Sequence, residues 1–168
     1  MTIALWVVGG VLVLFALTAF TGAPYVPSHR RDIQRVFRDG VKLTKDDVVL
    51  DIGAGDGVVL IEAAKLGAQA IGYEINPLLV LVARWRTRKY RDNVQVIWAN
   101  AWRRKPLERV TVLYAFGDGR DIRKMYALAE RQARAQRRAL TFVSYGFSVP
   151  GVEGVACGPY MLFTLRQP

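Results

Sequence analysis

A glycine-rich loop that directly follows a short apolar run constrains the fold of this chain most strongly. Residues 48–57 read VVLDIGAGDG, so three glycines alternate with other residues just past the run Val48–Leu50. Glycine lets the backbone turn sharply and lets a ligand lie directly against it. The sequence therefore predicts a ligand-binding turn at the end of a buried strand.

Strand-like apolar runs alternate with helical segments along most of the chain. Strands are predicted over residues 48–50, 70–74, 94–98, 110–116 and 140–145, and helices over about 29–38, 58–66, 77–90 and 121–134. This alternation is typical of an α/β fold with a Rossmann-like parallel sheet, helices on both faces and ligands at the carboxyl ends of the strands. Two further runs, 152–157 and 160–165, are joined by Gly158-Pro159 and predict a terminal hairpin.

The first 22 residues predict a single transmembrane anchor. No side chain from Met1 to Pro27 is charged, and residues 3–20 are almost wholly apolar, close to the roughly 20 residues that cross a hydrocarbon core. A cleaved signal peptide is the alternative, but a basic start and a convincing small-residue cleavage site are missing. Arg30 and Arg31 follow the segment, which by the positive-inside rule predicts that the folded domain lies on the cytoplasmic side.

The remaining chain divides into two parts. Residues 23–40 are predicted to form a linker and a helix, because two prolines in PYVPS (residues 24–28) hold the backbone extended before the helix begins. Residues 41–168 then form the folded domain. The whole chain has one histidine, His29, and one cysteine, Cys157. These counts argue against a metal site, an internal disulfide and a cysteine nucleophile.

The net charge of +10 belongs entirely to the part that follows the anchor. A positive balance of this size predicts an anionic surface as a partner, and a solvated positive face is the alternative for about half of the basic residues. For a tethered domain the nearest such surface is the lipid headgroup layer of the bilayer. RNA is the alternative, but no recognised RNA-binding motif accompanies the basic residues.

Three polar side chains each end one of the first three predicted strands. Asp51 ends the first strand, Glu74 ends the second, and Asn100 lies just past the third. Parallel strands bring their carboxyl ends to one edge of the sheet, so these side chains are expected close together.

This set of groups suits S-adenosylmethionine (AdoMet). Asp51 or Asp56 can accept from the ammonium group, Glu74 can accept from the two ribose hydroxyls, and Asn100 can pair with the adenine edge. The loop backbone would approach the methionine and ribose, and Ile75 and Trp102 would cover the ring. The predicted cofactor-binding residues are Asp51, Gly53, Ala54, Gly55, Asp56, Gly57, Glu74, Ile75, Asn100, Ala101 and Trp102.

A dinucleotide-binding dehydrogenase would also place an acid after its second strand. Its GxGxxG fingerprint fails here, because Val58 stands where the last glycine is required. A pyrophosphate would also be repelled by Asp51 and Asp56. The pattern therefore favours AdoMet.

From residue 41 to 166 the chain resembles the class I, seven-β-strand AdoMet-dependent methyltransferases. The succession of a hydrophobic anchor, PYVPS, DIGAGDG, GYEINP and the turn Asn100-Ala101-Trp102 is more closely similar to the mitochondrial lysine N-methyltransferases that act on the ATP synthase c-subunit and the adenine nucleotide translocase. The resemblance implies a seven-stranded sheet whose last strand is antiparallel, with AdoMet as cofactor and S-adenosylhomocysteine as product. It also implies lysine methylation of a membrane protein, with the PYVPS region forming part of the active site.

The acceptor site is expected after the fourth strand, where many amino-methylating relatives carry an Asn/Asp-Pro-Pro-aromatic motif. This chain has AFGDG at residues 115–119 instead. The predicted catalytic residues are Tyr25 and Phe116, as aromatic walls for the amine, and Asp118, which would orient it. Tyr114 and Tyr145 are further candidate walls. Ordinary core packing is the alternative role for each aromatic residue, and a turn residue is the alternative role for Asp118.

Two other functions remain open from the sequence. One is methylation of lipid amine headgroups or of RNA by an enzyme of the same fold. The other is an AdoMet-binding module without turnover.

Overall fold

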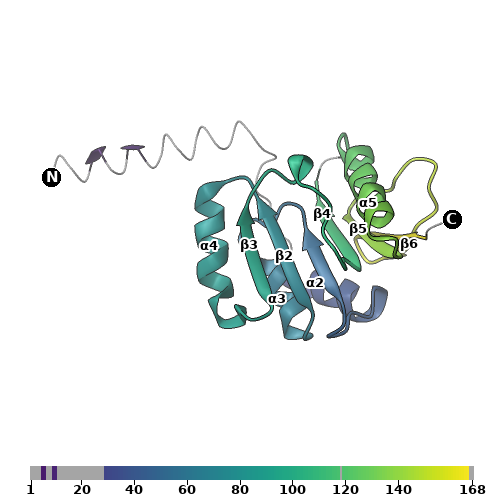
Figure 1. Ribbon diagram of the computed structural model, residues 1–168, viewed down its shortest axis with the longest axis horizontal. Coiled ribbons are helices and arrows are strands. Elements are labelled where there is room, and N and C mark those ends of the chain that lie inside the picture. The colour runs from purple at the N-terminus through teal and green to yellow at the C-terminus, as the bar shows by residue number, and fades with distance from the viewer. Residues whose placement is uncertain (1–4, 7–8, 11–28, 118, 167–168) are drawn as a thin grey trace.

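A seven-stranded sheet forms the centre of the domain, with its strands in the order β3-β2-β1-β4-β5-β7-β6 (Figure 1). The computed structural model describes residues 5–6, 9–10, 29–117 and 119–166. The strands are β1 (Val48–Asp51), β2 (Gln69–Glu74), β3 (Val94–Trp98), β4 (Val112–Phe116), β5 (Leu140–Tyr145), β6 (Val155–Cys157) and β7 (Tyr160–Leu165). Neighbouring strands from β3 to β5 are parallel, whereas β7 is antiparallel to both β5 and β6.

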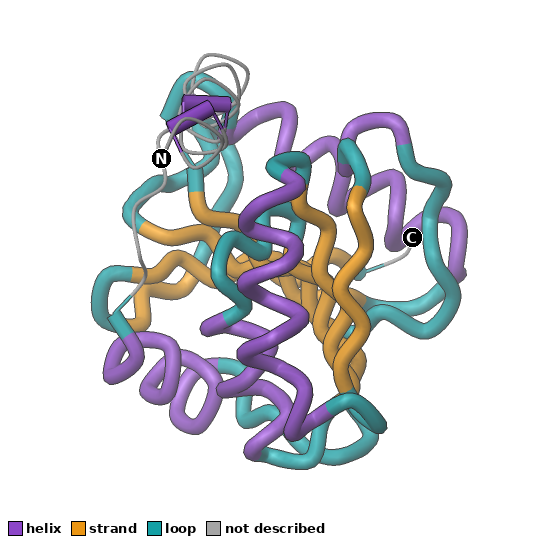
Figure 2. Tube along the Cα trace, turned by 90° about the vertical axis from the view of Figure 1, so that its left-hand side faces the viewer, coloured by secondary structure: helices purple, strands orange, loops and turns teal. Residues whose placement is uncertain are grey.

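Helices cover both faces of this sheet, but unequally (Figure 2). The helices are α2 (Arg30–Arg35), α3 (Val58–Lys65), α4 (Pro77–Thr87) and α5 (Ile122–Gln136), with a π-helical turn η1 (Val36–Gly40) and 3₁₀ turns η2 (Arg88–Tyr90) and η3 (Ala101–Arg103). One buried cluster joins α2, η1, α3 and α4 to the sheet, and a second joins α5 to the opposite face. The prediction of helices on both faces is confirmed.

The alternation of side chains along β1 shows why both faces need cover. Val49 packs in the cluster beneath α3, while Leu50 packs in the cluster on the side of α5, and both are buried. Successive residues of a strand point to opposite faces, so an apolar run such as Val48–Leu50 needs cover on both sides. The strand order reverses at β1, between β2 and β4, which is where ligands bind in open α/β sheets.

The start of α4 follows the predicted capping chemistry. The Asn76 side chain accepts hydrogen bonds from the backbone N–H groups of Leu78 at 2.9 Å and Leu79 at 3.4 Å. Pro77 occupies the first helical position, where the N–H it lacks would have no partner within the helix. The cap fixes the direction in which the chain leaves the end of β2.

Two predicted strands begin later than expected. The fourth strand was predicted from Val110 but begins at Val112, because Arg109 adopts φ of +66° and turns the backbone just before it. The first strand of the hairpin was predicted from Val152 but begins at Val155, because the N–H of Val152 bonds to the carbonyl of Val149 in a turn. The antiparallel hairpin itself is confirmed.

The predicted anchor and linker lie almost wholly outside the described residues. Of residues 1–22 only Leu5, Trp6, Gly9 and Gly10 are described, and of PYVPS none is. Within the part of the chain that the structure covers, no helix has the length and apolar character needed to span a membrane.

Candidate functional site

The glycine loop lies at the carboxyl edge of the sheet and is tied to the end of β2. The N–H of Ala54 donates to the carbonyl of Tyr73 at 2.9 Å, and the N–H of Gly55 donates to the carboxylate of Glu74 at 2.8 Å. Gly55 and Gly57 have φ of +54° and +82°, the left-handed region that glycine adopts without steric cost. The loop therefore needs glycine at these two positions to turn into α3.

The two sides of this loop differ in how much room they offer. A Cβ added to Gly53 would meet no atom within 4 Å, so the backbone there faces open space. Beneath the loop, a Cβ added to Gly72 of β2 would lie 2.6 Å from the Cβ of Ala54 and 2.7 Å from Leu60. The loop is thus packed tightly on the sheet and open above Gly53, where a ligand can lie against the backbone.

Asp51 is the most buried acid at this edge. Its side chain is only 1 % exposed and accepts a hydrogen bond from the N–H of Gly53 at 3.3 Å. Burial raises the pKa of Asp51 from 3.8 to about 7; the Gly53 hydrogen bond opposes this rise, and the negative charge of Glu74 adds to it. A cationic group beside Asp51 would favour the ionised carboxylate.

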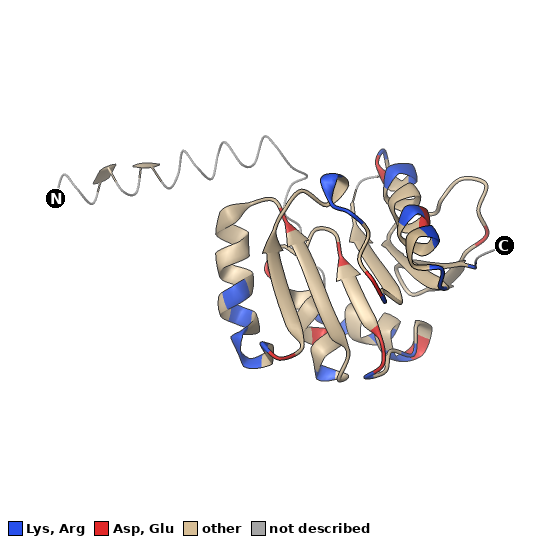
Figure 3. Ribbon diagram, in the orientation of Figure 1, with Lys and Arg blue, Asp and Glu red and all other residues tan. Residues whose placement is uncertain are grey.

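Glu74 lies next to Asp51 and holds two segments together. One carboxylate oxygen accepts from the N–H of Gly55 and the other from the N–H of Asn76, both at 2.8 Å. The side chain is 8 % exposed. Figure 3 shows the acidic groups at the ends of β1 and β2, side by side. Each oxygen retains a second lone pair that can accept from a ligand hydroxyl.

Asp56 has a different environment from the other two acids. Its carboxylate forms an ion pair with Arg86 of α4 and accepts from the N–H of Val58 at 3.2 Å. These contacts join the loop to α4 and to the first turn of α3. Of the two carboxylates predicted for the ammonium group, Asp51 is therefore the one without a cationic partner among the described residues.

The turn after β3 reaches the same edge. The N–H of Ala99 donates to the carbonyl of Glu74 at 2.9 Å, and the Asn100 side chain accepts from the N–H of Trp102 at 3.0 Å. Ala101 is buried, whereas Ile75 and Trp102 are 44 % and 43 % exposed. The structure thus brings together the groups predicted from three separate strand ends.

An aromatic cluster extends from the ends of β4 and β5 towards β7. The rings of Phe116 and Tyr145 stack with centroids 4.8 Å apart, and Tyr145 meets Tyr160 edge-on at 5.2 Å. The hydroxyls of Tyr160 and Tyr114 lie 3.4 Å apart, and Tyr114 contacts Phe37 of η1. Burial raises the pKa of Tyr160 to about 12; the hydrogen bond with Tyr114 opposes this rise, and the nearby charge of Asp51 is among the contributions that add to it. The cluster therefore adjoins the carboxyl edge of the sheet.

The sequence prediction included Phe116 but missed Tyr160. Tyr160 begins β7 and pairs with Tyr145 in an antiparallel register, so it reaches this edge from the opposite chain direction. Its position directly after the Gly158-Pro159 turn was the available signal. Tyr25 and Asp118, the other predicted catalytic residues, lie outside the described residues.

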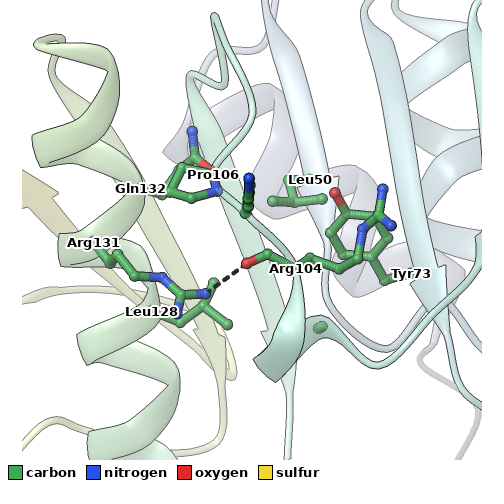
Figure 4. A pocket seen from close by; sticks show the side chains of 9 residues that line it. Leu50, Tyr73, Arg104, Pro106, Leu128, Arg131 and Gln132 are labelled. Atoms are coloured by element: carbon green, nitrogen blue, oxygen red, sulfur yellow. Dashed lines mark hydrogen bonds between the residues drawn. The ribbon is translucent and has the colours of Figure 1, made fainter.

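A small hollow lies on the face that carries α5, lined by side chains that include Leu50, Tyr73 and Arg104 (Figure 4). The Arg104 guanidinium lies over the ring of Tyr73 at 5.5 Å, and Arg131 donates to the carbonyl of Arg104 at 3.0 Å. The buried hydroxyl of Tyr73 has no hydrogen-bond partner among the described residues.

Comparison with known proteins identifies the fold and the family. A family model described as the ANTKMT methyltransferase domain matches residues 51–156, from the glycine loop to the hairpin. The chain belongs to this family. Its membership confirms the predicted class I AdoMet-dependent methyltransferase domain and its cofactor.

Two curated relatives illustrate the range of similarity within this chain. The lysine N-methyltransferase of the ATP synthase c-subunit from Xenopus laevis is 41% identical over 101 residues, which are 55% of this chain and 43% of the relative. The ribosomal RNA small subunit methyltransferase A of Thermotoga petrophila is 45% identical over 69 residues, 41% of this chain and 26% of the relative. The chain thus matches less than half the length of these relatives.

Solved structures support the fold. An RNA methyltransferase from Salinibacter ruber, crystallised with S-adenosylhomocysteine, superimposes with a TM-score of 0.68 at 23% identity and covers 83% of this chain and 92% of its own. This likeness shows the seven-stranded methyltransferase fold.

The residues at the carboxyl edge fit AdoMet. Asp51 can accept from an ammonium group and Glu74 from ribose hydroxyls, since both are carboxylates that bond to the backbone of the glycine loop. The free space above Gly53 admits a ligand against the backbone. The exposed side chains of Ile75 and Trp102 supply apolar surface for a ring.

Proposed function

We propose that this chain methylates a lysine side chain of a membrane protein while an N-terminal segment tethers it to the bilayer. The family match and the similarity to a lysine N-methyltransferase support the reaction. The c-subunit of ATP synthase is the substrate named for that relative. For this chain we propose only the class of substrate, a membrane protein.

The stacked rings of Phe116 and Tyr145, at the ends of β4 and β5, are the main observation in support of a lysine acceptor. AdoMet, when bound, supplies an electrophilic methyl group on a sulfonium. A lysine amine must be neutral to react with it, and the ordinary lysine pKa is about 10.4. Aromatic walls exclude water and so disfavour the charged ammonium, which lowers that pKa. Phe116 and Tyr145 would thus orient a neutral amine, with no strong base required.

The residues of the cofactor site are proposed to contribute to the reaction by holding AdoMet in a fixed position. Asp51 holds the ammonium group, Glu74 holds the ribose hydroxyls, and Asn100 pairs with the adenine edge. Ile75 and Trp102 cover the ring. Holding the donor in a fixed place converts an encounter in solution into a reaction between neighbours.

The tether is proposed from the sequence. Met1 to Pro27 carry no charged side chain, and the +10 net charge follows them. A single-pass anchor with the domain on the cytoplasmic side would place this positive charge at anionic headgroups.

Labelled AdoMet distinguishes the proposed substrate from its rivals. The full chain is incubated with membranes, and the label is then traced to protein, lipid or RNA, with mass spectrometry to locate the modified residue. We expect methylated lysine in a membrane protein with the wild-type chain and much less of it with Phe116→Ala. Label confined to lipid would contradict the lysine proposal, and bound AdoMet with no label in any fraction would favour a module without turnover.

RNA methylation is the second candidate, since part of the chain is 45% identical to a ribosomal RNA methyltransferase and the chain is strongly basic. Label that appears in RNA and disappears after ribonuclease treatment would establish it in place of lysine methylation.

A further inference from the structure

The outer side of α4 and the adjoining end of β3 expose an unusual amount of apolar surface. Leu81, Val82 and Trp85 of α4 are 62 %, 41 % and 65 % exposed, and Trp98 of β3 is 64 % exposed. These four residues are called the α4 face below. Large apolar side chains exposed together on one side of a helix and at the neighbouring strand end favour an interaction site over an ordinary surface.

Packing against the sheet does not explain this surface. The residues of α4 that face the sheet are Val80, Ala83 and Thr87, and all three are buried. Leu81 and Trp85 lie one turn apart on the opposite side of the helix, where a surface helix normally carries polar residues. Figures 1 and 2 show α4 along the outside of the domain, at the β3 edge of the sheet.

Basic side chains border the α4 face. The guanidinium of Arg88 lies over the ring of Trp85 at 4.7 Å and donates to the Trp85 carbonyl at 2.8 Å. Lys89 is exposed, and α4 contains no Asp or Glu. Figure 3 shows the basic groups gathered on the half of α4 that leads into η2. An apolar surface with a cationic border complements an anionic partner.

Trp98 extends this surface beyond the helix. Its indole Nε1 donates to the carbonyl of Ile75 at 3.0 Å, which holds the ring beside the start of α4. Tryptophan with its N–H satisfied and its ring exposed is typical of the membrane–water interface, where one part of the side chain is apolar and the other is wet.

We propose that the α4 face rests on an anionic lipid bilayer. Leu81, Trp85 and Trp98 would enter the boundary between headgroups and acyl chains, while Arg88 and Lys89 would reach lipid phosphates. This contact rests on the proposed tether, which would hold the domain near a membrane. Because Glu74 ends β2 only two residues before α4 is capped, the contact would hold the cofactor edge close to the bilayer, where a membrane-embedded lysine emerges.

Tryptophan quenching tests the contact directly. The full chain carrying Trp6→Phe, Trp98→Phe and Trp102→Phe keeps Trp85 as its only tryptophan. It is mixed with phosphatidylcholine vesicles that contain roughly 30 % phosphatidylserine and brominated acyl chains. We expect Trp85 emission to fall by roughly half, because interfacial indoles lie at the level of the headgroups.

The control places a tryptophan at the opposite edge of the sheet. Val155 of β6 is 69 % exposed, and Val155→Trp in a chain whose four native tryptophans are replaced by Phe should not be quenched. Amide hydrogen exchange of the wild-type chain provides a measurement free of substitutions. Vesicles should slow exchange at α4 and leave β6 unchanged.

Flotation of the vesicles separates this contact from the tether. A chain that floats while Trp85 stays unquenched and α4 unprotected would overturn the α4 contact and leave the tether intact. Flotation and Trp85 quenching that 1 M salt abolishes together would support the contact and contradict the membrane-spanning tether. A concentration-dependent blue shift of Trp85 without vesicles would instead show that a second copy covers the face, and would overturn the lipid contact.

Discussion

The carboxylate of Glu74 accepts the backbone N–H of Gly55 at 2.8 Å, across 19 residues of chain. Its other oxygen accepts the N–H of Asn76 at 2.8 Å. The acid predicted to hold the ribose thus also fixes the loop on which the methionine part of AdoMet would lie. One side chain couples the shape of the loop to the entry into α4.

Glu74→Gln should weaken both functions of this residue. A glutamine keeps one acceptor oxygen but presents an N–H₂ group to one of the two backbone N–H donors, so a buried donor loses its partner at a cost of about 1–3 kcal/mol. We expect that loss of unfolding free energy and an AdoMet affinity at least about tenfold lower, which corresponds to ~1.4 kcal/mol. Denaturant titration and calorimetry measure the two effects. Glu153→Gln, at an exposed glutamate, is the control and should change neither.

Two glycine substitutions should separate stability from binding. Gly72→Ala forces a methyl group against Ala54 and Leu60, so we expect a loss of about 1–3 kcal/mol in unfolding free energy. Gly53→Ala adds its methyl group to open space and should change stability by less than about 0.5 kcal/mol. Because that space is where AdoMet is proposed to lie, Gly53→Ala should nevertheless weaken AdoMet binding. Equal AdoMet affinity in Gly53→Ala and wild type would contradict the proposed site.

Asp51→Asn should stabilise the chain at neutral and alkaline pH. Burial raises the folded-state pKa of Asp51 to about 7, above its ordinary value of 3.8, so the folded state keeps a proton that the unfolded state releases between these values. Stability of the wild type therefore falls as pH rises through this window, by up to about 4 kcal/mol. The gain from Asp51→Asn should be near zero at pH 4 and largest above pH 7. Thermal unfolding at several pH values measures it, with the exposed Asp46→Asn as control.

AdoMet binding should show the opposite dependence on pH. The proposed ammonium partner is the ionised form of Asp51, which is lost as pH falls below about 7. We expect the AdoMet dissociation constant to rise between pH 8 and pH 5 in the wild type, and calorimetry to detect proton release on binding at pH 6. A dissociation constant that stays flat over this range would exclude Asp51 as the partner.

Phe116→Ala should impair methyl transfer and spare cofactor binding. Removal of the ring opens the proposed amine site to water beside Tyr145, and we expect kcat/KM for a lysine substrate to fall by about 10- to 100-fold. AdoMet affinity should stay within about twofold, since Phe116 lies at the end of β4, away from Glu74. Tyr145→Phe keeps the stacked ring and should retain activity. A similar loss in both variants would assign the role to the Tyr145 hydroxyl.

Much of the fold followed from local patterns. Alternating apolar runs and helix signals predicted the α/β sheet, and the Asn76-Pro77 pair predicted the start of α4, because capping involves residues only two or three positions apart. The meeting of Asp51 and Glu74 followed as well, since parallel neighbouring strands end at the same edge.

The sequence by itself thus determined the class of fold, the glycine loop and the acids beside it. Only the tertiary structure decided that Asp56 pairs with Arg86, that Tyr160 joins Phe116 and Tyr145, and that Trp85 faces outward. These features depend on the rotation of a helix about its axis and on the register of an antiparallel strand. Both are set by packing between segments far apart in the chain, and a periodic pattern within one segment does not specify them.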